Sequence, residues 1–415
     1  MGHIKVPDPK SLRKLHSTAL LVSSLAALFS CALCPQAVFA DETPLVTGNG
    51  FGFAVYSQQS KSISRFYAHP YKFEKADPKN LLSEGIETQS FVRTLNWRIE
   101  PHPGMLVPSS GGNRSSLESL QDNSEKKESA KAHQSHSMYL DQSHIIQASD
   151  DEKIQSFFMP FGLNQNVLIS TCSLSAMPKA PAATTTTLKF TLHSEWVHKV
   201  LNSSVVRVDG ITILALRFEG MKETLLLVPL GKIDESQIKT TFQNASKVSI
   251  DLSGAESWAF LSLETSADIK SSVTKLKQWQ SAKPVEHELA ELNKWRVAPA
   301  AKFKSEGERK LWRQSETVLR MAQIKETDNA SRHNHGLILA SLPDGAWFVP
   351  WVRDMAYATF ALIGMGHKDE AKAAIAAYLN ARPVGQMQRA VGNLPYQVSV
   401  VRYFGDGSEE PFFTM

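Results

Sequence analysis

The sequence ITILALRFEGMKETLLLVPL, residues 211–230, decides the fold class of the first part of the chain. It contains two runs of aliphatic and β-branched side chains, Ile211–Phe218 and Glu223–Leu230, separated by a short segment with a glycine. Runs of this length between turn residues are typical of β-strands. In the first run both alternating sets of positions are largely apolar, so we expect this strand to be buried on both faces.

The same pattern of short strands extends from about residue 46 to about residue 266. Gly, Asn, Asp and Ser residues separate the runs, as turn residues do in all-β domains. Regularly spaced short strands indicate an antiparallel β-sandwich, which we place at residues 41–285. Its other clear strand candidates are Asn166–Ser175, Thr187–Trp196, Lys247–Leu252 and Trp258–Glu264.

A polar insertion interrupts the predicted sandwich at about residues 109–144. It is rich in Ser, Gln, Lys, Glu and His and has few aliphatic side chains, so it cannot bury enough apolar surface to fold by itself. We therefore predict a mobile loop, in which His133, His136 and His144 are solvated and bind no metal.

Helical periodicity replaces the strand pattern near residue 267. An apolar stripe through Ile269, Val273 and Leu276 predicts one helix, and Pro284 suits the first turn of the next. The second helix connects the sandwich to the C-terminal region, and we assign residues 286–304 to this linker.

The last region, residues 305–415, begins with Ser305-x-x-Glu308, the capping box of a helix. Further helices are predicted at Trp351–Gly364 and Lys368–Ala381, each followed by Gly or Pro. These three helices are expected to be the first of a helical-hairpin array.

Residues 1–40 have the pattern of a secretory signal peptide, with basic residues, an apolar run and a Val-x-Ala ending at Ala40. The apolar run is shorter than the ~20 residues of a membrane span. A retained anchor and a lipoprotein modified at Cys31 are the alternatives. We expect a secreted or periplasmic protein that has Cys172 as its single cysteine after cleavage.

The net charge of the chain is only +4, with 42% hydrophobic and 21% charged residues. Such a balance gives no basis for a nucleic-acid partner or for binding to an anionic membrane. We therefore expect no nucleic-acid partner and no membrane contact after signal cleavage. The sequence also predicts neither a cofactor nor a metal site.

The segment HGLILASLPDGAWFVPWVRD, residues 335–354, carries the candidate binding chemistry. Trp347 and Trp351 can cover the apolar face of a sugar ring. Arg353 can donate hydrogen bonds to sugar hydroxyls, and Asp354 can accept them. The alternative is structural: two core aromatic side chains beside a surface ion pair.

This segment resembles the first substrate-binding motif of glycoside hydrolase family 15, the glucoamylase and glucodextranase family. The resemblance implies an N-terminal β-sandwich, a helical linker and an (α/α)6 barrel. It also implies that Arg353 and Asp354 bind the terminal glucose, although the family usually has Tyr at the position of Trp347. The matching residues are Gly336, Leu337, Ile338, Ala340, Ser341, Trp347, Trp351, Arg353 and Asp354.

The resemblance implies an inverting hydrolase, which needs a general acid and a general base. In the family both carboxylates come later in the chain, so we expect no catalytic residue here, and Glu409 and Glu410 are not assigned as catalytic. A twelve-helix barrel needs at least ~180 residues, more than residues 305–415 supply. We therefore expect an inactive N-terminal fragment of a secreted exo-acting α-glucosidase that acts on α-glucans or oligosaccharides.

The sequence leaves two alternatives open. One is a non-catalytic carbohydrate-binding or interaction protein in which the β-sandwich is the working part. The other is a different helical-barrel enzyme, such as a trehalase or a disaccharide phosphorylase, whose architecture is similar.

Overall fold

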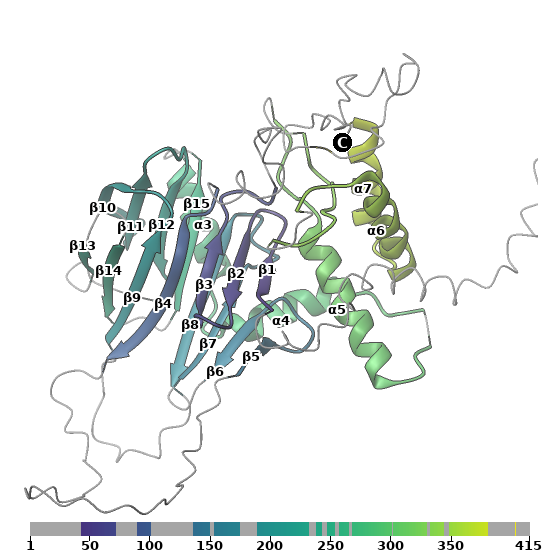
Figure 1. Ribbon diagram of the computed structural model, residues 1–415, viewed down its shortest axis with the longest axis horizontal. Coiled ribbons are helices and arrows are strands. Elements are labelled where there is room, and N and C mark those ends of the chain that lie inside the picture. Colours follow the sequence, from purple (N-terminus) through teal and green to yellow (C-terminus); the bar gives the residue numbers. More distant parts are fainter. Residues whose placement is uncertain are drawn as a thin grey trace, which may run out of the picture.

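The computed structural model describes residues 43–71, 89–100, 136–149, 153–174, 189–231, 238–242, 247–253, 257–264, 268–300, 302–329, 333–343, 348–380 and 403. Within these ranges the chain forms two antiparallel β-sheets followed by five helices (Figure 1). The predicted signal peptide and Trp347 lie outside the described residues. None of the described helices is both long and apolar enough to cross a membrane.

The first sheet has seven strands in the order β1-β2-β3-β4-β9-β14-β13, and the second has eight in the order β10-β11-β12-β15-β8-β7-β6-β5. The first consists of β1 (Leu45–Gly48), β2 (Phe53–Ser57), β3 (Ser62–Phe66), β4 (Val92–Glu100), β9 (Lys189–Trp196), β14 (Lys247–Ser253) and β13 (Ile238–Phe242). The second consists of β10 (Val200–Val208), β11 (Ile211–Phe218), β12 (Thr224–Pro229), β15 (Ser257–Leu263), β8 (Val167–Leu174), β7 (Lys153–Phe158), β6 (Ile146–Ser149) and β5 (His136–Tyr139).

The two apolar runs within residues 211–230 form the antiparallel pair β11–β12, in which Leu214 lies opposite Leu227. The other four predicted strands correspond to β8, β9, β14 and β15, with ends that differ by at most two residues. The sequence therefore located the centres of both sheets correctly.

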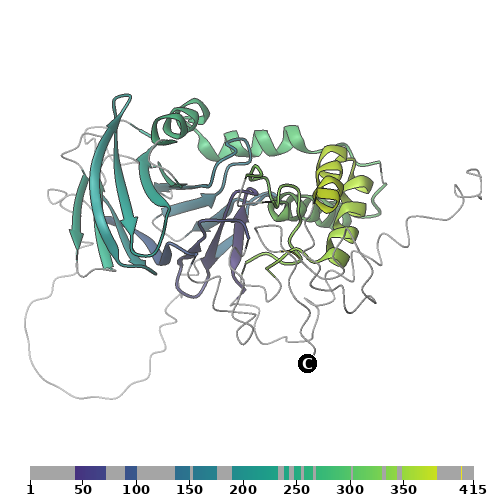
Figure 2. The same cartoon turned by 90° about the horizontal axis from the view of Figure 1, so that it is seen from above.

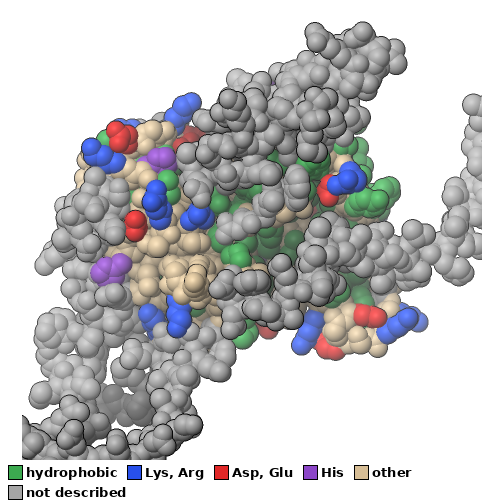
Figure 3. Space-filling view, in the orientation of Figure 1, with side chains coloured by type: hydrophobic (Ala, Val, Ile, Leu, Met, Phe, Trp, Pro, Cys, Tyr) green, Lys and Arg blue, Asp and Glu red, His purple; other side chains and the backbone are tan. Residues whose placement is uncertain are grey.

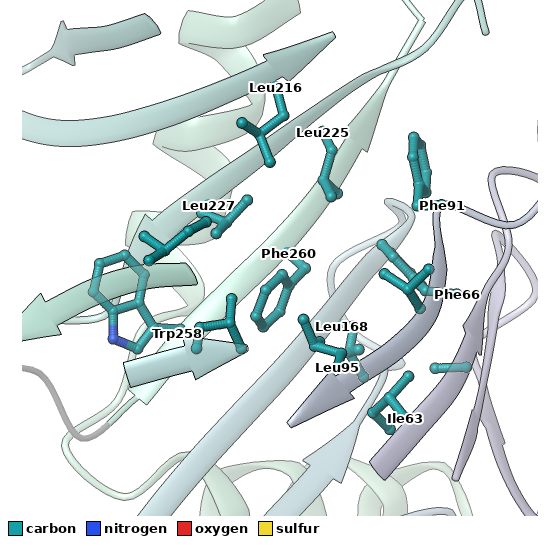
Figure 4. Packing of buried hydrophobic residues seen from close by; sticks show 14 of the residues in the cluster. Ile63, Phe66, Phe91, Leu95, Leu168, Leu216, Leu225, Leu227, Trp258 and Phe260 are labelled. Atoms are coloured by element: carbon teal, nitrogen blue, oxygen red, sulfur yellow. The ribbon is translucent and has the colours of Figure 1, made fainter. Parts of the chain in front are cut away.

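The core of the sandwich lies between the facing surfaces of the two sheets. Leu216, Leu225, Leu227 and Phe260 of the second sheet face Leu95 of the first, and all five are buried (Figure 4). Their alternation along each strand is the period of two that places every second side chain on one face.

The outer face of the second sheet is also buried, as the two apolar faces of residues 211–218 predicted. Ile213 and Ala215 of β11 pack in a second cluster with Val273 and Leu276 of helix α3 (Ile269–Trp279). Helix α4 (Pro284–Trp295) continues from α3 toward the remaining helices (Figure 2). The two predicted helices are thus present, and α4 begins at its proline.

Helix α5 (Glu306–Ala322) begins with the predicted capping box: the Ser305 side chain accepts a hydrogen bond from the Glu308 backbone N–H at 3.1 Å. Helix α6 (Val352–Met365) ends at Gly366, which has a φ of +91° and so adopts a left-handed conformation that glycine favours. Helix α7 is Lys368–Asn380. Helices α5, α6 and α7 occupy the region predicted to begin an (α/α)6 barrel, and the described residues form no closed barrel.

The helices share a core with the edge of the first sheet. Val46, Phe53 and Val55 from β1 and β2 lie in one buried cluster with Met355 and Leu362 of α6. The first sheet and the helices are therefore held together by a shared hydrophobic core as well as by the covalent connection of the backbone.

The predicted mobile insertion extends too far at its C-terminal end. Residues 136–139 form β5, which pairs with β6, and the remainder of the predicted insertion, residues 109–135, lies outside the described part of the chain. His144, expected to be solvated, is fully buried, and its Nε2 lies 3.0 Å from the Met159 carbonyl oxygen. The polar composition of this segment did not predict the β5–β6 hairpin. The hairpin is ordered by backbone pairing between its strands and by burial of Ile145 and Ile146.

Candidate functional site

The predicted sugar-binding residues lie at the N-terminal end of α6. Trp351 is the half-buried N-cap residue, with extended backbone, and Arg353 and Asp354 belong to the first turn. The side chains of Arg353 and Asp354 are 76% and 25% exposed, and the Arg353 Nη2 atom lies 3.4 Å from Asp354 Oδ2. This is a long, loose contact, so solvent reaches both charged groups.

The loop before α6 is fixed by the first half of the motif. Gly336 has a φ of +91°, and a Cβ there would lie 2.3 Å from the Ala373 carbonyl oxygen of α7. Leu337 and Ile338 are buried, and Ile338 forms a β-bridge with Gln323 at the end of α5. The Gly-Leu-Ile part of the motif therefore anchors the loop between α5 and α7 and does not reach solvent.

Two tyrosines that the sequence did not predict also lie at this end of α6. The Tyr378 hydroxyl donates to the Val352 carbonyl oxygen at 2.6 Å, and the Tyr403 backbone N–H donates to the Pro350 carbonyl oxygen at 3.2 Å. Burial, and then the nearby Tyr403 and Asp354, raise the pKa of the Tyr378 hydroxyl. Tyr378 is therefore a neighbour of both Tyr403 and the Asp354 carboxylate, although no local spacing in the sequence connects the three residues.

This arrangement brings an indole, a guanidinium, a carboxylate and tyrosine side chains to one helix end. The predicted Trp351, Arg353 and Asp354 do lie together. Within the described residues, the loose bond to Asp354 is the one hydrogen bond of the Arg353 guanidinium. Its remaining N–H groups can donate to ligand oxygens in a fixed planar geometry.

A second group of charged residues is buried where α4, α5 and α7 approach each other. Glu316 accepts hydrogen bonds from His367 Nε2 and Arg313 Nη1, each at 2.7 Å. Burial alone would raise the pKa of Glu316, but these two donors lower it below its usual value. Because both carboxylate oxygens are engaged inside the fold, this group is a structural ion-pair network.

Comparisons with known proteins place the chain in no family. No protein-family model matches it, and no curated protein matches it in sequence. Among solved structures, a putative kojibiose phosphorylase from the human microbiome superposes with a TM-score of 0.41 and 10% sequence identity. The superposition covers 77% of this chain and 44% of that protein, so the chain spans less than half the length of this structure.

Proposed function

We propose that this chain is the sugar-binding part of a carbohydrate-active enzyme, and that it holds a glucose unit at the N-terminal end of α6. The supporting observation is the exposed Arg353 next to the Asp354 carboxylate, on the helix end that Trp351 caps. A carboxylate accepts from sugar hydroxyls, a guanidinium donates to them, and charged hydrogen bonds of this kind contribute about 1.5–3 kcal/mol each.

The rigid setting of these residues also supports the proposal. Binding groups lose less conformational entropy when their backbone is already fixed. Here the helix starts from a loop that is tied to α5 by the Leu339 N–H bond to the Ala322 carbonyl oxygen and to α7 by the close approach of Gly336. Tyr378 adds a bond from α7 to the first residue of α6.

The more specific form of the proposal rests on the sequence resemblance. In this form of the proposal, the chain belongs to a secreted, inverting, exo-acting α-glucosidase of the glucoamylase or glucodextranase type, which acts on α-glucans. The competing proposal is a carbohydrate-binding protein without hydrolytic activity. Because the chain itself is expected to lack both catalytic carboxylates, the two proposals are distinguished by glucose release from maltotriose in a protein that joins this chain to a helical region supplying them.

The binding site is tested by titrating the full chain with maltose and maltotriose and following heat or tryptophan fluorescence. We expect Arg353→Ala and Asp354→Asn each to weaken binding at least tenfold without changing the melting temperature by more than a few degrees. Arg309→Ala is the matched control, because Arg309 also pairs with an acidic residue on an exposed helix surface. Equal affinities for wild type and both variants would show that Arg353 and Asp354 form only a surface ion pair.

A further inference from the structure

Three side chains that are distant in sequence meet at the end of the sandwich nearest the helices. His69 follows β3, Glu223 directly precedes β12, and Glu264 directly follows β15. One nitrogen or oxygen ligand atom from each lies within 4.8 Å of the others. The His69 Nε2 and Glu223 Oε1 atoms lie 3.0 Å apart. This cluster is separate from the Arg353 site and plays no part in the proposed sugar binding.

Strand register forces the two glutamates together. Thr224 of β12 lies opposite Leu263 of β15, so Glu223 and Glu264 face each other one residue beyond this pair. With His69 Nε2 only 3.0 Å from Glu223 Oε1, the two carboxylates and the imidazole together supply nitrogen and oxygen ligands that a divalent cation can share.

The second ring nitrogen of His69 contacts another carboxylate, that of Glu326, which orients the imidazole. His69 Nδ1 lies 3.4 Å from Glu326 Oε1, and the Tyr71 hydroxyl donates to Glu326 Oε2 at 2.6 Å. Metal-bound histidines almost always donate their second ring N–H to a carboxylate, carbonyl or water, which fixes the tautomer. In the tautomer with the proton on Nδ1, the lone pair of Nε2, which lies 3.0 Å from Glu223 Oε1, is available to a cation.

The backbone on both sides of the cluster is fixed by one buried residue. The side-chain amide of Asn166 donates to the carbonyl oxygens of Tyr67 and Ala68, at 2.9 and 2.7 Å. The backbone carbonyl of Asn166 accepts from the Ser262 N–H at 3.0 Å. The segment leading to His69 and the strand leading to Glu264 are therefore held at a set separation before any ligand binds.

We propose that His69, Glu223 and Glu264 form a binding site for a divalent transition-metal ion of the zinc type, with Glu326 as a positioning residue. One neutral imidazole and two carboxylates balance a charge of +2, and this nitrogen and oxygen set suits zinc better than calcium, which prefers oxygen ligands alone. Bond lengths of about 2.0–2.2 Å in a tetrahedral site place ligand atoms roughly 3.3 Å apart, close to the His69–Glu223 separation.

The ion would also connect the sandwich to the segment after α5, because Glu326 belongs to that segment and holds His69. An ion that binds the folded chain and not the unfolded one stabilises the fold increasingly as its concentration exceeds Kd. The expected signature is therefore an increase of the melting temperature with added zinc that EDTA reverses.

The test uses the full chain, freed of metal by EDTA and dialysis, titrated with ZnCl2 by calorimetry and by thermal melting. We expect one tight site per chain in the wild type, and at least a tenfold loss of affinity in Glu264→Gln. Glu264 is exposed, so this variant should keep the fold, which circular dichroism checks. Glu326→Gln should weaken zinc binding 10- to 100-fold while leaving the stoichiometry at one.

Glu219→Gln is the matched control, because Glu219 is an exposed carboxylate in the same turn between β11 and β12 but outside the cluster. It should bind zinc like the wild type and show the same thermal shift. The proposal is overturned if the wild type binds no zinc stoichiometrically, if Glu264→Gln binds as tightly as wild type, or if Ca²⁺ binds more tightly than zinc.

Discussion

At the scale of single residues, the junction between the sheets and the helices contains a half-buried lysine whose charge is unfavourable. Burial, followed by the nearby Arg320, lowers the pKa of Lys325 from 10.5 to about 8. Between about pH 8 and pH 10.5, the unfolded chain binds more protons than the folded chain, so the free energy of unfolding rises with pH. We predict that Lys325→Met stabilises the protein at pH 7, by on the order of 2–3 kcal/mol, and removes this rise.

Urea denaturation between pH 7 and pH 10 measures this effect. Lys310→Met on the exposed side of α5 is the control and should leave the pH profile of the wild type unchanged. A wild-type stability that does not rise above pH 8, or a profile that is the same in Lys325→Met, would contradict the assigned environment of this lysine.

At the scale of elements, α6 has one face in the core and another that faces solvent. Leu362 is fully buried in the cluster shared with β1 and β2, whereas Phe360 is 70% exposed. Ile363 on α6 and Leu379 on α7 are also at least half exposed, and hydrophobic side chains gather over these two helices in Figure 3. We predict that Leu362→Ala lowers stability by about 2–5 kcal/mol.

The matched variant Phe360→Ser should leave stability nearly unchanged and reduce self-association, because contiguous exposed apolar surface promotes aggregation. Chemical denaturation and light scattering at several protein concentrations measure the two effects. If both variants destabilise the fold equally, the exposed and buried faces of α6 are wrongly assigned.

The elements also show what sequence could and could not predict. Strands such as β11 and β12 were predictable because their apolar runs are local and continuous. Strand β10 was not predicted, since most of its residues are exposed and it lacks an apolar stripe. In the same way Arg353 and Asp354 are neighbours in sequence, whereas Tyr378 is brought near Asp354 only by the packing of α7 on α6. The cluster around His69 depends on the register between β12 and β15, and no local sequence pattern predicts that register.

At the scale of the whole molecule, the first two strands belong to the helical core as well as to the sandwich. Phe53 of β2 meets Phe348, just before α6, edge to face with ring centroids 5.5 Å apart, and both side chains are buried. The sandwich centre around Leu227 is a different cluster. The sheet edge and the helices are therefore expected to open together, while the sandwich centre opens with the global unfolding of the chain.

This arrangement predicts how a local defect spreads. Phe53→Ala removes a large buried ring at the shared core, at a cost of about 3–5 kcal/mol. Hydrogen exchange should then accelerate in α6 and α7 as well as in β1 and β2. Leu227→Ala is the control, and it should accelerate exchange in β11, β12 and β15 and affect α6 and α7 only through global unfolding. Unchanged protection of α6 in Phe53→Ala would mean that the helices are held by contacts among themselves, and that the sandwich edge does not support them.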